Sequence, residues 1–311
     1  MSDGHTGPTA GGEIVVSSLT KQYRNVKAVD NLSFRVQPGR VTGFLGPNGA
    51  GKTTTLRMLL NLVTPTAGTA TIDGQRYPDL KQPLRTVGAL LEASSAHKGR
   101  TGINHLRVIC AAAGLPKQRA DETLAMVGLS PAAKRKFKGY SLGMKQRLGI
   151  AAAMLGDPKV LVLDEPANGL DPEGIRWMRG FLKGLAAEGR TVLVSSHLLS
   201  EMQLLADDVV IIAAGKLVRQ GTVDEVLGSM TTGARIRVRT PHPDQLAKAL
   251  TEQNAQVQRG EDGLLLVEGN DAAFVGRVAL AAQVELHELT PERPDLERVF
   301  LELTSGKAVI R

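Results

Sequence analysis

The sequence contains one cysteine and few aromatic residues. Cys110 is the only cysteine among the 311 residues, so the chain cannot form an internal disulfide. It lies in the apolar run 108–111, and a small buried residue is a better interpretation of it than a reactive thiol. This cysteine usage suits a reducing compartment. Because Phe, Trp and Tyr supply 3% of the residues, the core must consist mostly of Val, Leu, Ile and Ala.

Long hydrophobic runs are also missing. No stretch approaches the roughly 18 apolar residues that a membrane-spanning helix needs. Residues 1–12 are rich in Gly, Ser and Thr and have no apolar centre, which predicts a disordered lead rather than a signal peptide. We therefore expect a soluble chain, whose role at a membrane would depend on a partner.

The charge of the chain is positive but not concentrated. A formal net charge of +7 favours anionic partners such as nucleotides, anionic lipid or nucleic acid. The chain lacks a basic stripe interleaved with aromatic residues, the pattern typical of nucleic-acid-binding surfaces. We therefore expect no nucleic-acid partner. Five of the six histidines show no metal-ligand spacing, and we expect no histidine metal cluster.

Alternating strands and helices are predicted from residue 13 to about residue 230, which indicates an α/β domain built on a parallel sheet. The runs 160–163 and 191–194 are short and wholly apolar, as in strands that helices cover on both faces. Residues 93–155 are rich in Ala, Leu, Lys and Arg with helical periodicity, and we interpret them as a helical insertion. The other predicted elements are strands at 14–16, 32–36, 41–45, 86–91 and 209–212, a helix at 53–62, and helix breaks at 114–116 and 130–131.

The pattern restarts on a smaller scale near residue 231. We predict an accessory α+β module over residues 233–311. This module has no catalytic constellation, and regulation or support of a dimer is a hypothesis for it. Its predicted elements are strands at 235–239, 263–268 and 284–289, and helices at 243–252, 271–282 and 295–303.

A glycine-rich loop follows the predicted strand 41–45. Residues 46–53 read GPNGAGKT and match G-x-x-x-x-G-K-[ST], with the required strand before and helix after. The alternative is an ordinary turn with an incidental lysine, which a full match in this context disfavours. We expect Lys52 to reach the β- and γ-phosphates and Thr53 to bind Mg²⁺. The nucleotide-binding residues predicted here are Gly46, Pro47, Asn48, Gly49, Ala50, Gly51, Lys52, Thr53 and Thr54.

Two acids and a histidine are expected at one edge of the sheet. Asp164 ends one apolar run, Glu165 follows it, and His197 ends the next run. The carboxyl ends of parallel strands share an edge where α/β folds bind ligands. Asp164 would meet Mg²⁺ directly or through water, and Glu165 would be the general base for the attacking water. His197 would contact the γ-phosphate or that water, so Glu165, His197 and Lys52 are the predicted catalytic residues.

The segment 140–155, YSLGMKQRLGIAAAML, contains no acid, histidine or cysteine. Alone it predicts an ordinary helix whose cap is Ser141. A serine hydroxyl and the N–H of Gly143 at a helix N-terminus also suit a phosphate. The segment therefore leaves open a cap alone or half of an anion-binding site.

The order of these motifs resembles the nucleotide-binding subunit of ABC transporters. The phosphate loop, the helical insertion, the Ser-Gly segment 140–147, the Asp-Glu pair, residues 169–171 and the histidine follow that family's order over about residues 13–227. The resemblance implies a P-loop NTPase fold and ATP hydrolysis with Mg²⁺. It implies that two such chains, either two copies or one copy and a homologous ATPase subunit, pack head to tail. ATP would lie between the phosphate loop of one chain and Ser141 and Gly143 of the other.

Further roles follow from the same resemblance. Tyr23 would stack on adenine, and residues 168–171, which include Asp171, would connect the two nucleotide sites. An integral-membrane permease would dock near residues 92–105 and hold the chain at the cytoplasmic face of the cell membrane. ATP-driven closure of the dimer would move that permease.

Two motifs depart from the common family pattern. The signature usually reads Leu-Ser-Gly-Gly-Gln, whereas Leu142 replaces its first Gly and Met144 its Gln. Glu92 stands where a Gln usually meets Mg²⁺ and the membrane partner; a carboxylate can also bind Mg²⁺. Both departures, and the terminal run 295–304, resemble a subgroup of bacterial exporters of drugs, antibiotics or lantibiotics whose ATPase and membrane subunits are separate chains.

Two other functions stay open at this point. One is an ABC-type ATPase that acts on nucleic acid or ribosomes without a membrane partner. Such proteins carry a long coiled-coil insertion or two tandem ATPase domains, and this chain shows neither. The other is a P-loop kinase, which would lack the segment 140–147 and the histidine at the sheet edge.

Overall fold

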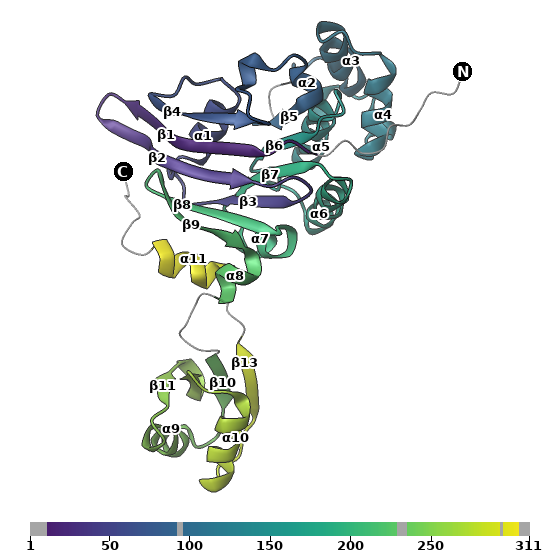
Figure 1. Ribbon diagram of the computed structural model, residues 1–311. Coiled ribbons are helices and arrows are strands. Elements are labelled where there is room, and N and C mark those ends of the chain that lie inside the picture. Colours follow the sequence, from purple (N-terminus) through teal and green to yellow (C-terminus); the bar gives the residue numbers. More distant parts are fainter. Residues whose placement is uncertain (1–10, 92–95, 229–234, 293–294, 305–311) are drawn as a thin grey trace. The chain divides into compact units, whose positions relative to one another are not determined.

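The computed structural model describes residues 11–91, 96–228, 235–292 and 295–304 (Figure 1). It divides into two compact units: the first comprises the residues up to Val223 and those from Leu303 onward, and the second runs from Asp224 to Glu302. The sequence pattern places this boundary later, near residue 230. None of the helices in the described segments is long and apolar enough to cross a membrane.

The first unit is built on a six-stranded sheet with the order β5-β6-β7-β3-β8-β9. All neighbours are parallel except β8 and β9, which are antiparallel. Its central strands are buried along most of their length, which confirms the α/β fold with a parallel sheet. The strands are β3 (Val41–Leu45), β5 (Val87–Leu90), β6 (Val160–Asp164), β7 (Thr191–Ser196), β8 (Asp208–Ala213) and β9 (Lys216–Thr222).

A separate antiparallel sheet has the order β2-β1-β4, from β1 (Ile14–Tyr23), β2 (Val26–Val36) and β4 (Ala67–Ile72). The main core lies between this sheet and the six-stranded one (Figure 1). Phe34 of β2 stacks on Phe44 of β3 with ring centroids 5.2 Å apart. The two sheets therefore share one hydrophobic core.

Two glycines correct the predicted disordered lead. Gly11 and Gly12 are buried, whereas residues 1–10 lie outside the described part of the chain. The N–H of Gly11 donates to the carbonyl of Gly189 over 2.7 Å, and the carbonyl of Gly12 accepts from the Thr191 hydroxyl over 2.7 Å. These bonds attach the chain directly before β1 to the start of β7.

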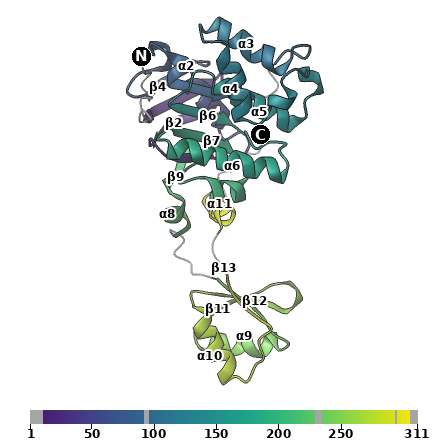
Figure 2. The same ribbon diagram turned by 90° about the vertical axis from the view of Figure 1, so that its right-hand side faces the viewer.

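Helices α3, α4 and α5 form the predicted insertion and gather at one end of the first unit (Figures 1 and 2). The Cys110 side chain is buried on α3, and burial raises the pKa of its thiol, as expected of a structural residue. The predicted strand 86–91 is shorter, because a helical turn precedes it. The helices of this unit are α1 (Lys52–Leu59), α2 (Pro83–Thr86), α3 (Gly102–Ala112), α4 (Gln118–Met126), α5 (Leu142–Ala153), α6 (Pro172–Ala187) and α7 (Leu199–Leu205).

The second unit contains a four-stranded antiparallel sheet with the order β11-β12-β10-β13. With α9 and α10 it has the β-α-β-β-α-β arrangement of ferredoxin-like folds. Buried side chains of β10, β12 and both helices form its own core. The elements are α8 (Val223–Gly228), β10 (Arg235–Arg239), α9 (Pro243–Glu252), β11 (Gln256–Arg259), β12 (Leu264–Glu268), α10 (Ala272–Ala281), β13 (Glu288–Glu292) and α11 (Leu296–Thr304).

Candidate functional site

The phosphate loop connects β3 to α1 and needs its glycines. Gly49 and Gly51 have φ values of +81° and +102°, which other residues adopt at a cost. A Cβ atom on Gly51 would overlap the carbonyl of Ala28, and one on Gly46 would lie 2.6 Å from the carbonyl of Ile212. The loop is therefore held tightly against β2 and β8, directly before the N-terminus of α1.

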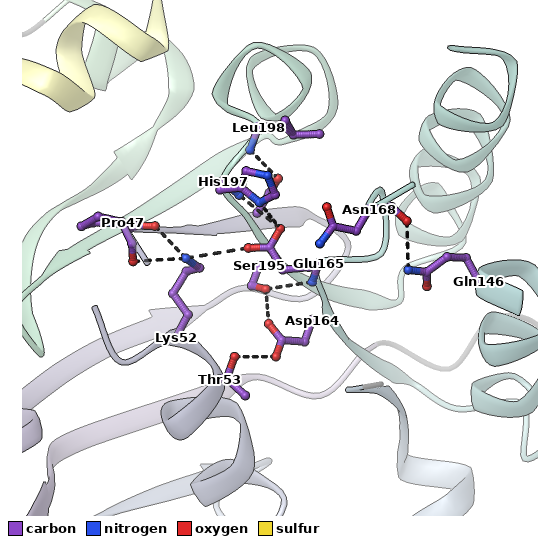
Figure 3. A network of polar contacts seen from close by, with 12 residues as sticks. Pro47, Lys52, Thr53, Gln146, Asp164, Glu165, Asn168, Ser195, His197 and Leu198 are labelled. Atoms are coloured by element: carbon purple, nitrogen blue, oxygen red, sulfur yellow. Dashed lines mark hydrogen bonds and ion pairs between the residues drawn. The ribbon is translucent and has the colours of Figure 1, made fainter. Parts of the chain in front are cut away.

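The Lys52 side chain lies inside this loop and is 7% exposed. Its Nζ donates to the carbonyl of Gly46 over 2.7 Å and to that of Pro47 over 3.4 Å (Figure 3). Burial lowers the pKa of Lys52, and the nearby carboxylates of Glu165 and Asp164 oppose this shift. The loop thus holds a buried cation close to its own backbone, where a phosphate oxygen could replace a carbonyl as its partner.

Asp164 and Thr53 form the pair expected of a magnesium site. The Thr53 hydroxyl donates to Oδ2 of Asp164 over 2.7 Å (Figure 3). Both groups offer hard oxygen ligands, which Mg²⁺ prefers. The described residues contain no group of three or more His, Cys, Asp or Glu side chains that could hold a metal. The pair supplies two oxygen ligands, which fits Mg²⁺, an ion that usually takes its other ligands from phosphate and water. Glu92, the third predicted ligand, lies outside the described residues.

Ser195 is a site residue that the sequence analysis missed. It is fully buried at the end of β7, directly opposite Asp164 of β6. Its hydroxyl donates to Oδ1 of Asp164 and accepts from the N–H of Glu165 over 3.0 Å. One hydroxyl therefore orients both acidic residues. The sequence shows Ser195 only as a polar residue near the end of an apolar strand, and its place beside Asp164 depends on the pairing of β6 with β7.

Glu165 lies between a cation and a histidine. Its Oε1 is 3.8 Å from Nζ of Lys52, and its Oε2 is 2.6 Å from Nδ1 of His197 (Figure 3). Its backbone has a φ of +49°, an unusual value for a residue other than glycine and one that recurs at functional sites. The structure thus brings Lys52, Glu165 and His197 together, with a carboxylate that can accept a proton from a water molecule.

The predicted signature residues lie at the start of α5. Oγ of Ser141 accepts from the N–H of Met144 over 3.2 Å, so Ser141 does cap this helix. Asp171 caps α6 in the same way, through the N–H of Gly174 over 2.8 Å. Ser141, Gly143 and Asp171 line one hollow of about 470 Å³, to which no residue of the phosphate loop contributes. Within one chain, these two groups of predicted nucleotide-binding residues line separate places.

Three other predicted residues lie at or near the surface of the first unit. Tyr23 ends β1, is half exposed, and has Nζ of Lys21 4.9 Å from its ring centroid. Its ring is thus accessible for stacking. Asn48 is exposed at the tip of the phosphate loop, and Thr54 is partly buried on α1.

Comparisons of the sequence with known proteins identify related families for both units. A family model described as ABC transporter matches residues 29–168, and a model described as a domain of unknown function (DUF8746) matches residues 234–297. An uncharacterized ABC transporter ATP-binding protein of Bacillus subtilis (strain 168) is 38% identical, over 93% of this chain and 95% of that protein. A bacitracin transport ATP-binding protein of Bacillus licheniformis is 36% identical, over 95% of this chain and 98% of that protein. A lantibiotic transport ATP-binding protein of Streptococcus pyogenes is 36% identical, over 67% of this chain and 90% of that protein.

Solved structures agree with the fold of the first unit. A structure described as the ATP-binding subunit of an ABC transporter superposes with a TM-score of 0.62 at 28% identity, over 68% of this chain and 91% of that chain. A dimeric bacterial ABC transporter cassette is similar in fold, with a TM-score of 0.62 at 24% identity over 68% of this chain and 98% of its own length.

Proposed function

Because this chain belongs to the family of ABC transporter ATP-binding subunits, we propose that it powers a transporter by closing over ATP together with a second ATPase chain. ATP binding and hydrolysis are the activity of the chain. This proposal rests on one observation: the Glu165 carboxylate lies between Lys52 and His197, at the same edge of the six-stranded sheet as the phosphate loop.

ATP would bind through the phosphate loop. Lys52 would exchange the carbonyls of Gly46 and Pro47 for β- and γ-phosphate oxygens, while backbone N–H groups at the start of α1 would donate to the same phosphates. Thr53 and Asp164 would hold Mg²⁺, which neutralises phosphate charge when it is bound. The exposed ring of Tyr23 would stack on adenine.

Hydrolysis would depend on two side chains at the edge of the sheet. Glu165 would accept the proton of the attacking water as general base. His197 would hold the γ-phosphate, while its Nδ1 keeps the Glu165 carboxylate oriented. Ser195 would fix the backbone and carboxylate geometry of the acidic pair. Phosphoryl transfer needs mainly such positioning and charge stabilisation.

The second half of each nucleotide site would come from another chain. Ser141 and Gly143 form a helix N-terminus without an acidic residue in its first turn, which suits the charge of a γ-phosphate. They line a hollow apart from the phosphate loop of their own chain. Head-to-tail packing of two chains, either two copies or one copy and a homologous ATPase subunit, would bring each signature to the other chain's ATP. Hydrolysis would remove this bridge and let the dimer open.

A permease would bind at an apolar hollow between the insertion and β5. This hollow of about 460 Å³ is lined mostly by apolar side chains, among them Leu62, Leu84, Ile109, Phe137 and Leu148, with His105 and Lys145 beside them. Residues from the described part of the predicted docking segment 92–105 also line this hollow. An apolar surface of this kind is suited to receive a helix from a protein partner. The chain would then lie at the cytoplasmic face of the membrane through that partner.

Leu84→Glu should weaken binding to the permease and leave ATP hydrolysis by the isolated chain unchanged. Leu84 is 39% exposed and lines the hollow, so a charge there would have to be buried in the complex. The measurement is binding in detergent to a purified candidate permease, a multi-helix membrane protein that co-purifies with the parent chain. The matched control is Leu204→Glu on α7, which is 52% exposed and does not line this hollow. Equal binding by both variants would contradict the docking proposal.

The transported compound would be an antibiotic or a peptide. This proposal rests on relatives whose names specify bacitracin or lantibiotic transport. The direction would be export, as in the subgroup that the signature departures resemble. The alternative of an ABC-type ATPase that acts on nucleic acid or ribosomes is not favoured by these relatives, which are named for transport.

A further inference from the structure

One face of α5 packs closely against the loop that leads from Glu165 to α6. Gly169 lies in this loop with a φ of +72°, and a Cβ atom on it would overlap the Leu142 side chain. A Cβ atom on Gly143 would lie 3.3 Å from Cδ2 of Leu170. Leu142, one of the two unusual signature residues, therefore occupies the space above Gly169. It is nevertheless 51% exposed, so its contact with the loop is not that of an ordinary core residue.

The next turn of α5 contacts the same loop through hydrogen bonds. Nε2 of Gln146 donates to the carbonyl of Asn168 over 3.3 Å, and the N–H of Asn168 donates to the carbonyl of Glu165 over 3.1 Å. Two hydrogen bonds thus run from the signature helix to the main chain of Glu165. Figure 3 shows the Asn168 side chain on the Glu165 side of the loop. The main-chain carbonyl of Asn168 points toward Gln146.

Gln146 is held in place by its surroundings. It is 6% exposed, and among the described residues its Oε1 has no hydrogen-bond partner. Beside it, the Arg147 guanidinium lies 4.2 Å from the ring centroid of Trp177 and bonds to the carbonyl of Val127 over 3.2 Å. The helix is therefore attached both to the loop and to α6.

We propose that Gln146 and Leu142 are positioning residues. Through them, the position of the signature helix α5 determines the position of Glu165 in the same chain. Under the proposed function, α5 of one chain meets the ATP of the other chain. A shift of α5 would then move residues 168–170 and, through Asn168, the main chain of Glu165. Each chain would hydrolyse its own ATP at full rate only when its signature is seated on the ATP of its partner.

Gln146→Met keeps the volume of the side chain and removes the hydrogen bond to Asn168. We expect kcat for ATP to fall roughly tenfold, the rate equivalent of about one hydrogen bond, with unchanged nucleotide affinity. The control Gln245→Met removes a similar bond, 2.9 Å from Nε2 to the carbonyl of Ala282, in the second unit and should change neither quantity. A Gln146→Met chain with the parent's kcat would overturn the proposal. So would a loss of kcat that is accompanied by an equal loss of nucleotide affinity.

Leu142 provides the second part of the test. Leu142→Gly should lower kcat in the same way, whereas Leu142→Met, which still covers Gly169, should retain it. If both residues act through one connection, the Leu142→Gly/Gln146→Met double variant loses little more than the stronger single variant. Losses that simply multiply in the double variant would show two separate effects and overturn the shared role. Permease binding is measured separately, so a failure here leaves the proposed function untouched.

Discussion

Glu165→Gln should bind ATP and hydrolyse it about 10²- to 10⁴-fold more slowly than the parent chain, the range that general bases contribute. The amide has the shape of the carboxylate but cannot accept the proton of the attacking water. The contacts that would bind ATP remain, because Lys52 keeps its place in the phosphate loop and Thr53 its bond to Asp164. The measurement is single-turnover hydrolysis beside a titration of nucleotide affinity.

The same variant should accumulate as an ATP-bound dimer. If hydrolysis is the step that removes the bridge between the chains, a chain that cannot hydrolyse ATP stays closed. Light scattering with ATP and Mg²⁺ should therefore give the mass of two chains, and with ADP the mass of one. Glu188→Gln, at an exposed acid that pairs with Arg190, is the matched control. A Glu165→Gln chain that turns over ATP like the control would refute the general-base assignment.

Lys52→Ala should reduce ATP affinity by about 10- to 100-fold, because a hydrogen bond to a charged group contributes roughly 1.5–3 kcal/mol. The effect is expected to be large because Lys52 is buried inside the phosphate loop, where solvent screens its charge weakly. Titration with a nucleotide measures this loss, and circular dichroism establishes that the variant folds. Lys183→Ala, an exposed substitution on α6, serves as the control. An unchanged affinity for ATP would contradict the role assigned to the loop.

The sequence predicts the parts of the site that depend on local pattern. The phosphate loop is recognisable because eight consecutive residues and both flanking elements carry its signal. Asp164, Glu165 and His197 could be placed at one edge because parallel strands end on the same side of a sheet. The structure brings these side chains together, while their catalytic roles stay predictions.

Contacts between distant segments could not be predicted. Ser195 is one of many serines until the pairing of β6 and β7 places it opposite Asp164. The contact of Leu142 with Gly169 depends on how α5 packs against a loop, and no local sequence pattern specifies the conformation of that loop. The separate antiparallel sheet of β1, β2 and β4 was likewise unseen, because a strand pattern does not identify its neighbours.

In the second unit, two strands had weak signals. Strand β11 reads QVQR, with a single apolar residue, and was not predicted. Strand β13 was predicted at 284–289, but it runs from Glu288 to Glu292 and contains Pro291. Proline is tolerated there because β13 lies at the edge of its sheet. Val284 is buried, but it lies in the segment that precedes the strand.

Mixing two inactive variants shows whether each nucleotide site is shared by two chains. Lys52→Ala disables the phosphate loop, and Ser141→Arg blocks the signature with a large side chain. In a head-to-tail dimer of the two, both lesions fall in one site and the other site is intact. If the site is shared, the mixture hydrolyses ATP faster than either variant alone. A mixture that is no faster than the mean of the separate variants would contradict it.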